Sequence, residues 1–298
     1  MKIKIGVDVG GTKTRVAYLN SNNKVEILGH VPTSQNPDEA VKNIIGVINS
    51  AHLPGEIEKI GIVCPGPLNQ ETGVVLSPPN LLQWHNFPLT AILKKEFGVD
   101  VILENDANAG ALGEAVFGAA KNANTVLYFS LSTGIGAGVV INQKVYGGYK
   151  GLAGEIWCVP LKLFGAATGE KSITELSSGN GMVEIARERI AEGVETIINK
   201  QNPTTYEIFN ACHKGDKLAI ELIENALAVL TGTMVFSSCL LAPDVIVLGG
   251  GLTSDEGLFL HPLEKRFKQA MPLGELKDTP IIKSSLDNDS VLYGAFGL

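Results

Sequence analysis

The sequence lacks the features that mark several large classes of protein. Its 298 residues include four cysteines, none in a CxxC pair, and 6% aromatic residues. Lysines and arginines are scattered, and the formal net charge is −7. Because nucleic-acid-binding domains usually carry a basic patch, we expect no nucleic-acid partner. The cysteine spacing predicts four reduced thiols, as is typical of a cytosolic protein.

The sequence also shows neither the pattern of a leader sequence nor a long apolar run. The segment MKIKIGVDVGG alternates apolar and polar residues, whereas a signal peptide has a continuous apolar core. No uninterrupted apolar run reaches about 18 residues, the length that a membrane span needs. We therefore expect a cytoplasmic location and no membrane partner. The 45% hydrophobic content, without low-complexity tracts, predicts an ordered globular chain. The length of 298 residues suggests about two domains.

Apolar periodicity predicts strands that alternate with helices. Strands are expected at residues 2–9, 14–19, 25–31, 57–63, 101–103, 125–131, 137–141 and 245–248, and helices at about 37–48, 107–116, 182–190, 218–241 and from 290. The first helix has Asn36 as N-cap and Pro37 at its first position. Residues 2–9 alternate strictly, which predicts a strand with one buried face. The alternation favours the α/β class, with mixed sheets flanked by helices.

The strand pattern restarts in the second half of the chain. Twelve positions separate Asp8 from Asn20, and twelve separate Ser130 from Asn142. Both segments contain a strand, a glycine/threonine turn, a strand, a polar turn and Lys-Val, which indicates a repeat. We predict a small N-terminal domain of residues 1–117, joined by a C-terminal helix at 290–298, and a larger domain of residues 118–289.

Two glycine turns stand at matching places of this repeat, one at residues 10–13 and one at 133–136. Glycine lets the backbone approach a phosphate, and N–H and hydroxyl groups donate to its oxygens. Each turn alone could be an ordinary hairpin, but the matched pair favours a two-sided clamp on a polyphosphate. Asp8, at the end of its strand, could hold Mg²⁺ directly or through water.

Two further segments have both a functional and a plain structural interpretation. Gly249, Gly250 and Gly251 follow an apolar strand, where they leave room for a flat ring or a ribose, or form a loose loop. Glu155 is flanked by small residues in GLAGE, which suits hydrogen bonds from substrate hydroxyls, although a surface glutamate is the simpler interpretation.

Asp106 follows a predicted strand and begins a predicted helix. Ligands of open α/β sheets bind at such strand ends. Asn105 or Asp106 could instead serve only as a helix N-cap. In phosphoryl transfer the base needs only to orient the attacking hydroxyl and to accept its proton late in the reaction. Capping and catalysis at Asp106 are therefore compatible.

Taken in order, these segments resemble the ROK family of sugar kinases, within the actin-like/hexokinase ATPase fold. The resemblance covers the whole chain, with DVGGTKT at 8–14, PGP at 65–67, ENDANAGALGE at 104–114, LSTGIGAG at 131–138, GLAGE at 151–155 and VIVLGGG at 245–251. It implies two actin-like, ribonuclease H-like domains with a cleft between them. It also implies an ATP-dependent kinase that uses Mg²⁺, a small-molecule sugar as the second substrate, and a homodimer.

The resemblance implies a role for each matching residue. Asp106 would be the catalytic base that takes the proton of the sugar hydroxyl, and Asp8 would help to place Mg²⁺. The residues that would bind the sugar are Asn105, Asp106, Glu155, Gly66 and Glu175. The position at which the family has its second sugar-binding glutamate falls on Thr174, and Glu175 is the residue after it. The residues that would bind the nucleotide are Gly10, Gly11, Thr12, Lys13, Thr133, Gly134, Gly136, Gly249 and Gly250.

Two departures from the family pattern fall on the sugar side. The family usually follows GLAGE with a Gly-His pair whose histidine touches the sugar and ligates a structural zinc, and here Trp157 and Cys158 stand there. The short run of three cysteines that follows in the family is absent from residues 163–170. A structural zinc needs four N or S ligands, so we predict no zinc.

Three hypotheses for the function follow. The first is a glucokinase-type hexokinase, with fructose, mannose or an N-acetylhexosamine as other substrates. The second is a sugar-responsive transcriptional repressor; such relatives carry an N-terminal helix-turn-helix domain, whereas the first strand here begins at Ile3, so we expect none. The third is a non-catalytic sugar sensor, against which Asp106 and both phosphate turns argue. The motif set favours the kinase.

Overall fold

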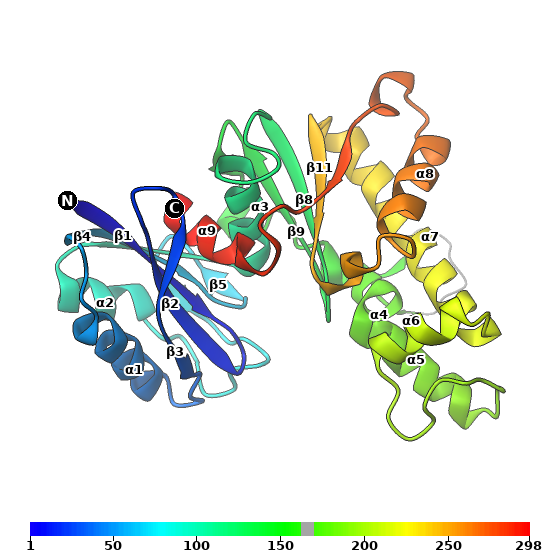
Figure 1. Cartoon of the computed structure of the whole chain (residues 1–298), viewed down its shortest axis with the longest axis horizontal. Helices are drawn as coiled ribbons and strands as arrows, with labels where there is room; N and C mark the ends of the chain where they lie inside the picture. The colour runs from blue at the N-terminus through cyan, green and yellow to red at the C-terminus, as the bar shows by residue number, and fades with distance from the viewer. Residues whose placement is uncertain (162–169) are drawn as a thin grey trace. The chain divides into compact units, whose positions relative to one another are not determined.

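The structure, a computed structural model, describes residues 1–161 and 170–298, without the side chain of Asp287. The described residues form two compact units (Figure 1). Unit 1 comprises Met1–Asn124, Gly138–Ala153 and Ser284–Leu298, and unit 2 comprises Thr125–Ala137 and Gly154–Lys283. The predicted domain boundary near residue 117 stays a prediction.

The first sheet has the strand order β3-β2-β1-β4-β7. Its strands are β1 (Lys2–Val9), β2 (Lys13–Leu19), β3 (Val25–Pro32), β4 (Glu56–Val63) and β7 (Asp100–Glu104). A small hairpin consists of β5 (Leu68–Asn69) and β6 (Val74–Val75). The helices of this unit are α1 (Pro37–Ser50), α2 (Leu89–Phe97), α3 (Asp106–Val116) and α9 (Ser290–Gly297).

The second sheet has the order β10-β9-β8-β11-β12. Its strands are β8 (Thr125–Leu131), β9 (Ile135–Ile141), β10 (Lys144–Val145), β11 (Val245–Gly249) and β12 (Ile281–Lys283). The helices of unit 2 are α4 (Ile173–Ser177), α5 (Gly179–Ala191), α6 (Thr205–His213), α7 (Lys217–Leu241) and α8 (Leu260–Ala270). Counted along the chain, both sheets place their strands in the order third, second, first, fourth, fifth. The predicted repeat and the α/β class with mixed sheets are confirmed.

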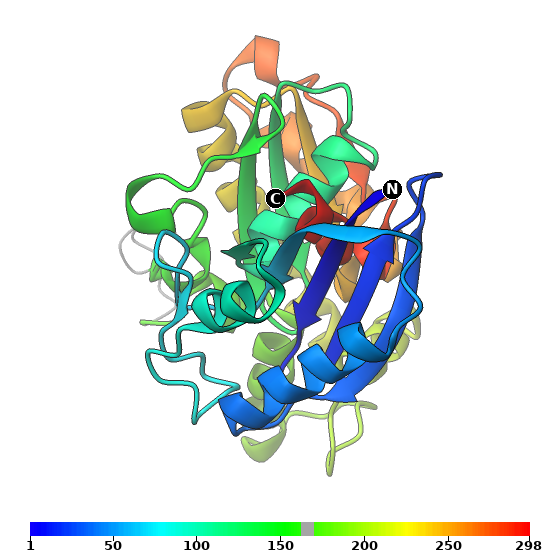
Figure 2. The ribbon, with the colours of Figure 1, turned by 90° about the vertical axis from the view of Figure 1, so that its left-hand side faces the viewer.

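Helices cover both faces of the unit 1 sheet. On one face, the apolar residues of β1 pack with those of α1 and α2, and Figure 2 shows α1 along the strands. On the other face, a Cβ atom on Gly6 would stand 2.7 Å from the ring of Phe296 in α9. The expectation of a single buried face is therefore wrong, because Gly6 lets a second helical layer cover the sheet.

Helices α3 and α9 pack against each other through backbone rather than long side chains. A Cβ atom on Gly294 would stand 1.9 Å from the Ala109 carbonyl oxygen, and one on Gly113 would stand 2.2 Å from the Ser290 oxygen. The end of α9 is also tied to the sheet, because Lys4 Nζ donates to the Phe296 carbonyl at 2.8 Å. The helix that begins at Asp106 thus rests on the C-terminal helix.

Among the described residues, α7 is the one helix whose length and apolar composition would allow it to cross a membrane. Its inner face, which includes Leu222, Leu230 and Met234, is buried in unit 2. The outer face carries Phe236 and Leu240, which are 56% and 71% exposed. This burial is typical of a core helix, whose apolar content comes from packing inside the unit.

Candidate active site

The carboxyl ends of β1, β4 and β7 meet at one edge of the unit 1 sheet. These strands pair in parallel, with Asp8 opposite Val63 and Val63 opposite Glu104. Since neighbouring strands lie about 4.8 Å apart, the backbone of Asp8 stands roughly 10 Å from that of Glu104. Asp106 follows Glu104 by two residues. Asp8 and Asp106 therefore share the edge at which open α/β sheets bind ligands.

The buried carboxylate of Glu104 holds the loop that leads into α3. Its Oε1 accepts hydrogen bonds from Asn105 N at 2.8 Å, Asn108 Nδ2 at 3.0 Å and Gln70 Nε2 at 3.3 Å. Gln70 Nε2 also lies 3.4 Å from the Gly151 carbonyl oxygen. One oxygen atom thereby joins β7, α3 and the loop after β5, so the position of Asp106 is fixed from three directions.

Asn105 caps helix α3, whereas Asp106 is exposed. Asn105 is the N-cap of α3, because its Oδ1 accepts a hydrogen bond from Asn108 N at 2.7 Å. Asp106 is the first residue of the helix, and its Oδ1 accepts from Ala107 N at 2.9 Å. Glu104, Asn105, Ala107 and Asn108 are buried, whereas Asp106 is exposed. The carboxylate of Asp106 is therefore the one in this segment that a substrate can reach.

Asp8 faces Arg15 of β2. Nε and Nη2 of Arg15 both contact Asp8 Oδ2, at 3.0 and 2.9 Å, and Nη1 contacts Asp289 Oδ1 at 2.7 Å. Burial raises the pKa of Asp8, and the opposing effect of the Arg15 charge is smaller. Oδ1 of Asp8 accepts no hydrogen bond from any described residue. One carboxylate oxygen is therefore available to a cation or to its bound water.

The carboxylate of Asp8 fits a Mg²⁺ ion that is bound together with a nucleotide. The described residues contain no group of three or more His, Cys, Asp and Glu that could hold a metal by themselves. Mg²⁺ does not need such a group, because proteins usually hold it through one or two carboxylates, substrate phosphates and water. Asp8 can supply the carboxylate.

The turn Cys64-Pro65-Gly66-Pro67 follows β4 at the same sheet edge. Cys64 is fully buried, and its N–H donates to the Glu104 carbonyl at 3.0 Å. Burial raises the pKa of the Cys64 thiol far above its usual range, and the charges of Asp106 and Asp8 add to the shift. Gly66 is half-buried, and a Cβ atom there would have its nearest neighbour at 3.9 Å. A side-chain position at Gly66 is thus open at this sheet edge.

We expect Cys64 to resist thiol reagents in the native protein, because the thiolate is the reactive form. Cys158 and Cys239 are exposed and should be labelled first. Labelling with a dithiobis-nitrobenzoate reagent, followed by mass spectrometry of the peptides, measures the order. A urea-unfolded sample, in which all four thiols react, is the control. Rapid labelling of Cys64 in the folded protein would contradict the expectation.

The first glycine turn joins β1 to β2. Gly10 N donates to the Lys13 carbonyl at 3.0 Å, and a Cβ atom on Gly10 would stand 2.8 Å from that oxygen. The tight turn therefore requires glycine at position 10. Thr12 and Lys13 are exposed and Gly11 is half-buried. The backbone N–H groups, the hydroxyl and the ammonium of this turn can all donate to an anion.

The second glycine turn, Thr133 to Gly136, joins β8 to β9 and is held by α4 and α5. Ile135 N donates to Thr174 Oγ1 at 3.0 Å. Gly179 N donates to the Ser132 carbonyl at 2.8 Å, and Asn180 N to the Thr133 carbonyl at 3.2 Å. Thr133 is exposed and Gly134 is half-buried. The hydroxyl of Thr174 therefore supports this turn.

Packing explains two glycines of the segment after β11. A Cβ atom on Gly249 would stand 2.3 Å from the Tyr128 hydroxyl, and one on Gly250 would stand 2.4 Å from the Leu131 carbonyl. Gly250 also has a φ of +91°, which favours glycine. A Cβ atom on Gly251 would meet nothing within 4 Å. The open space that a flat ring needs therefore lies at Gly251.

Glu155 is half-buried and interacts with the residue two places along. Its Oε2 accepts a hydrogen bond from Trp157 Nε1 at 2.5 Å. Trp157 is 48% exposed, and the thiol of Cys158 lies 3.6 Å from the Glu155 carbonyl oxygen. Trp157 and Cys158 stand where the family usually has Gly-His, so a thiol replaces the imidazole and an indole occupies the glycine position close to this glutamate.

Glu175 has a local structural partner. Its Oε2 accepts hydrogen bonds from Ser172 N at 2.8 Å and Ser172 Oγ at 2.7 Å, which completes a capping box at the start of α4. These bonds lower the pKa of Glu175. A role in sugar binding would require this carboxylate to serve both partners, and it stays a prediction. Of the segment 163–170, where the family has its zinc cysteines, residues 163–169 lie outside the described residues.

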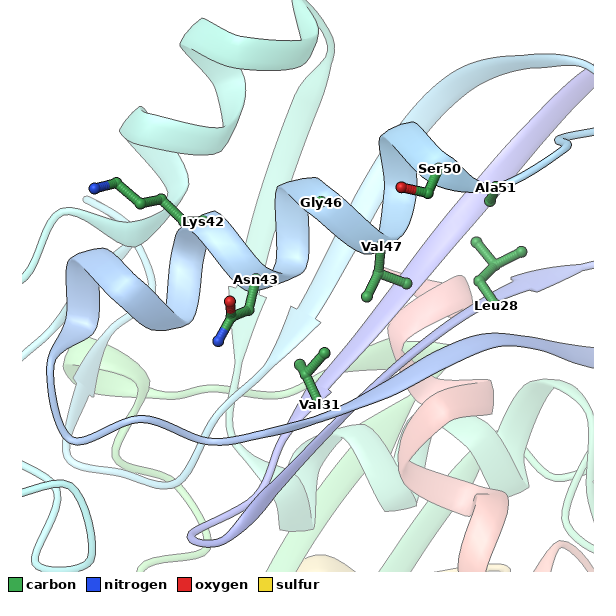
Figure 3. A pocket seen from close by; sticks show the side chains of 8 residues that line it. All are labelled: Leu28, Val31, Lys42, Asn43, Gly46, Val47, Ser50 and Ala51. Atoms are coloured by element: carbon green, nitrogen blue, oxygen red, sulfur yellow. The ribbon is translucent and has the colours of Figure 1, made fainter.

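A shallow groove runs between α1 and the edge strand β3 (Figure 3). It is lined by Leu28, Val31, Lys42, Asn43, Gly46, Val47, Ser50 and Ala51. No predicted site residue lines it. The chemistry proposed below therefore rests on the strand ends and turns.

Several residues that build the site had no role in the sequence interpretation. They are Gln70, Glu104, Asn108, Glu114 and Arg15. Glu104 and Glu114 are the two ends of the ENDANAGALGE motif, and Glu114 is fully buried. A glutamate inside an otherwise apolar helix was the available signal, because charged side chains are seldom fully buried without partners.

Three known proteins are similar to the chain over nearly its whole length. The glucokinase of Streptomyces coelicolor is 29% identical over 310 residues, which cover 100% of this chain and 98% of that protein. The crystal structure of the ROK hexokinase from Thermus thermophilus has a TM-score of 0.82 at 30% identity, covering 98% of this chain and 96% of that one. The ROK family glucokinase from Streptomyces griseus, solved with glucose and AMPPNP, has a TM-score of 0.77 at 25% identity, covering 98% and 97%.

The family model described as "ROK family" matches residues 4–298. This match contains every motif on which the resemblance was based, from the turn after β1 to the glycines after β11. The chain belongs to the ROK family.

Proposed function

We infer that this chain is an ATP-dependent sugar kinase of the glucokinase type, which transfers the γ-phosphoryl group of ATP to a hydroxyl of a hexose. The full-length similarity to a glucokinase and to ROK hexokinase structures supports this function. One observation carries the assignment of the chemistry: Asp106 is exposed at the carboxyl end of the sheet, in a segment whose other residues are buried.

Asp106 acts as the catalytic base. Its carboxylate orients the attacking hydroxyl and accepts the hydroxyl proton as the new O–P bond forms, while the bond from the γ-phosphorus to the bridging oxygen breaks and ADP leaves. The network of Glu104, Asn105 and Asn108 holds the first turn of α3, so the carboxylate is in place before substrate arrives. Such prior positioning lowers the entropic part of the barrier.

Asp8 holds Mg²⁺, directly or through water. When bound, the ion neutralises charge on the phosphates. Arg15 keeps Asp8 Oδ2 in place and leaves Oδ1 for the ion or its water. Gly10, Gly11, Thr12 and Lys13 donate to the phosphates from one turn.

In unit 2, Thr133, Gly134 and Gly136 form the second phosphate turn, and Gly249 and Gly250 shape the backbone that borders the adenosine. The open space at Gly251 favours this assignment. We also keep the proposed division into domains of residues 1–117 with 290–298, and 118–289.

Glucose is the proposed sugar, with fructose, mannose and N-acetylhexosamines as the other candidates. Asn105 uses its Oδ1 as a cap, so its Nδ2 is the group that donates to a sugar oxygen. Glu155 accepts from sugar hydroxyls, and Trp157 fixes the orientation of its carboxylate. Gly66 leaves space beside Asp106, and Glu175 is the remaining candidate ligand.

We further propose a cytoplasmic location and a homodimer. Four free thiols and the use of ATP favour the cytoplasm. The exposed apolar side chains of Phe236 and Leu240 on α7 favour an interface on that face. Sedimentation of the purified protein measures the oligomeric state.

The decisive assay measures release of ADP from Mg²⁺–ATP in the presence of a panel of sugars. We expect glucose to stimulate ADP release at least about tenfold over the sugar-free rate, since a closed site favours the hydroxyl over water. The panel includes fructose, mannose, N-acetylglucosamine and N-acetylmannosamine, each with and without added zinc. Added zinc should leave the rate unchanged.

The outcomes separate the hypotheses. Stimulation by another hexose alone would retain the kinase and change its substrate. If no sugar stimulates ADP release, while sugar still changes the fluorescence of the exposed Trp157, the chain is a sensor rather than an enzyme. Trp84 is fully buried, so a Trp84→Phe variant assigns the fluorescence change to Trp157.

A further inference from the structure

Glu114 is a fully buried carboxylate near the C-terminal end of α3. Its Oε1 accepts hydrogen bonds from Ser284 Oγ at 2.5 Å and Leu286 N at 3.0 Å. Its Oε2 accepts from Ala119 N at 2.9 Å and from both N and Oγ of Ser285 at 3.3 Å. Five donor groups on one buried carboxylate use all of the roughly four lone-pair sites that its two oxygens offer.

The donors lie beside two of the points where the chain passes between the units. Ala119 lies in the segment that leads from α3 to the passage at Asn124 and Thr125, and Ser284 is the first residue after the passage from Lys283. Both groups of donors belong to unit 1. Glu114 therefore fastens the outgoing and the returning chain to one helix, a few residues from where each enters or leaves unit 2.

The neighbouring sequence fits this arrangement closely. A Cβ atom on Gly118 would stand 2.2 Å from Glu114 Oε2, so only glycine lets the carboxylate reach the Ala119 N–H. Glutamate is also specific at position 114. Each of its oxygens accepts from a backbone N–H, so glutamine in either orientation would turn its own NH₂ group toward a backbone N–H.

We propose that Glu114 is a positioning residue for phosphoryl transfer: it fixes two of the chain passages between the units to α3, the helix whose first residue is Asp106. This inference rests on the proposed function. Kinases of this kind close around their substrates, and chain segments between moving parts must bend at defined places. By holding residues 119 and 284–286 rigid, Glu114 confines the bending to the adjoining residues and keeps α3 in register during closure.

The test compares Glu114→Gln with wild type. We expect kcat for glucose phosphorylation to fall about tenfold to a hundredfold, as for a small misplacement of a reacting group, while KM for glucose and for ATP changes less than about threefold. A larger share of the ADP released should come from hydrolysis by water. Hydrogen exchange should quicken at the amides of Ala119, Ser285 and Leu286.

Asp216→Asn is the matched control. Asp216 also accepts backbone N–H bonds on both oxygens, from Ala219 and Ile197, and a third bond from Thr196. All of these partners lie inside unit 2. Asp216→Asn also replaces a carboxylate by an amide, but none of its hydrogen-bond partners lies beside a point where the chain passes between the units. Its kcat should stay within about twofold of wild type when the folded fractions are equal.

Ser284→Ala is the second test, for use if Glu114→Gln fails to fold, because it removes one of the five donors and leaves the carboxylate. We expect faster exchange at Ser285 and Leu286 and a kcat below that of Asp216→Asn. The inference is overturned if a folded Glu114→Gln, or Ser284→Ala, keeps the kcat and the hydrolysis share of Asp216→Asn. A wild type without sugar-dependent ADP release would instead overturn the proposed function.

Discussion

Replacing Asp106 with Asn should lower kcat for sugar phosphorylation by about a thousandfold, because the amide cannot accept the hydroxyl proton. The capping network should survive, since the N-cap is Asn105 and Ala107 N can donate to the amide oxygen. ATP binding, measured by calorimetry, should be unchanged. Only the proton-accepting group of the site is altered, so the loss should fall on kcat rather than on KM.

Asp100→Asn is the control for this variant. Asp100 is the exposed first residue of β7, the strand that precedes Asp106, and a hydrogen bond from Lys94 lowers its pKa. Neutralising it should leave kcat at the wild-type value. An Asp106→Asn variant that retained more than about a tenth of wild-type kcat would exclude Asp106 as the base.

Replacing Gly294 with Ala should lower the free energy of unfolding by about 2 kcal/mol. Helix propensity alone predicts the opposite sign, because alanine in a helix is favoured over glycine by roughly 0.5–1 kcal/mol. The added Cβ atom would stand 1.9 Å from the Ala109 carbonyl oxygen. That oxygen belongs to the backbone of α3 and cannot turn aside as a side chain can, so the two helices must separate.

Gly232→Ala on α7 tests the propensity effect by itself, because a Cβ atom there meets nothing within 4 Å. This control should be neutral or slightly stabilised. Urea unfolding of the two variants gives the difference. If Gly294→Ala were as stable as Gly232→Ala, the close approach of α3 and α9 would be wrong.

The sequence was informative wherever a local pattern determines the element. Asn36 caps α1 as predicted, because its side chain accepts from the N–H groups of Asp38 and Glu39. The eight predicted strands all form, with ends that differ by at most two residues. Alternation and caps depend on neighbours in the chain, so a single sequence contains the information.

The sequence analysis did not predict two short helices, α2 and α6, whose local sequence signals differ. Helix α2 has no side-chain cap hydrogen bond and begins directly after Pro88. Helix α6 did carry a signal, since Thr204 caps it and Glu207 stands three positions later. Propensity in such short helices is weak, and tertiary packing decides whether they form.

The site was predicted as motifs, and its supporting contacts were not. Asp106 and Asp8 stood out because each polar residue ended an apolar strand. Gln70 could not be found in this way, since it reaches Glu104 across 34 residues of sequence. The choice of Asn105 over Asp106 as the cap also depended on side-chain geometry that a sequence does not contain.

The discontinuity of unit 1 has a consequence for biosynthesis. Its sheet and helix α3 emerge early from the ribosome, but the partner of α3, helix α9, is made of residues 290–297. Until those residues appear, the face of the sheet around Gly6 and the glycine side of α3 have no cover. Contacts between distant parts of a chain form slowly, and exposed apolar surface invites aggregation. Nascent chains of this protein should therefore depend on chaperones until the last helix has been synthesised.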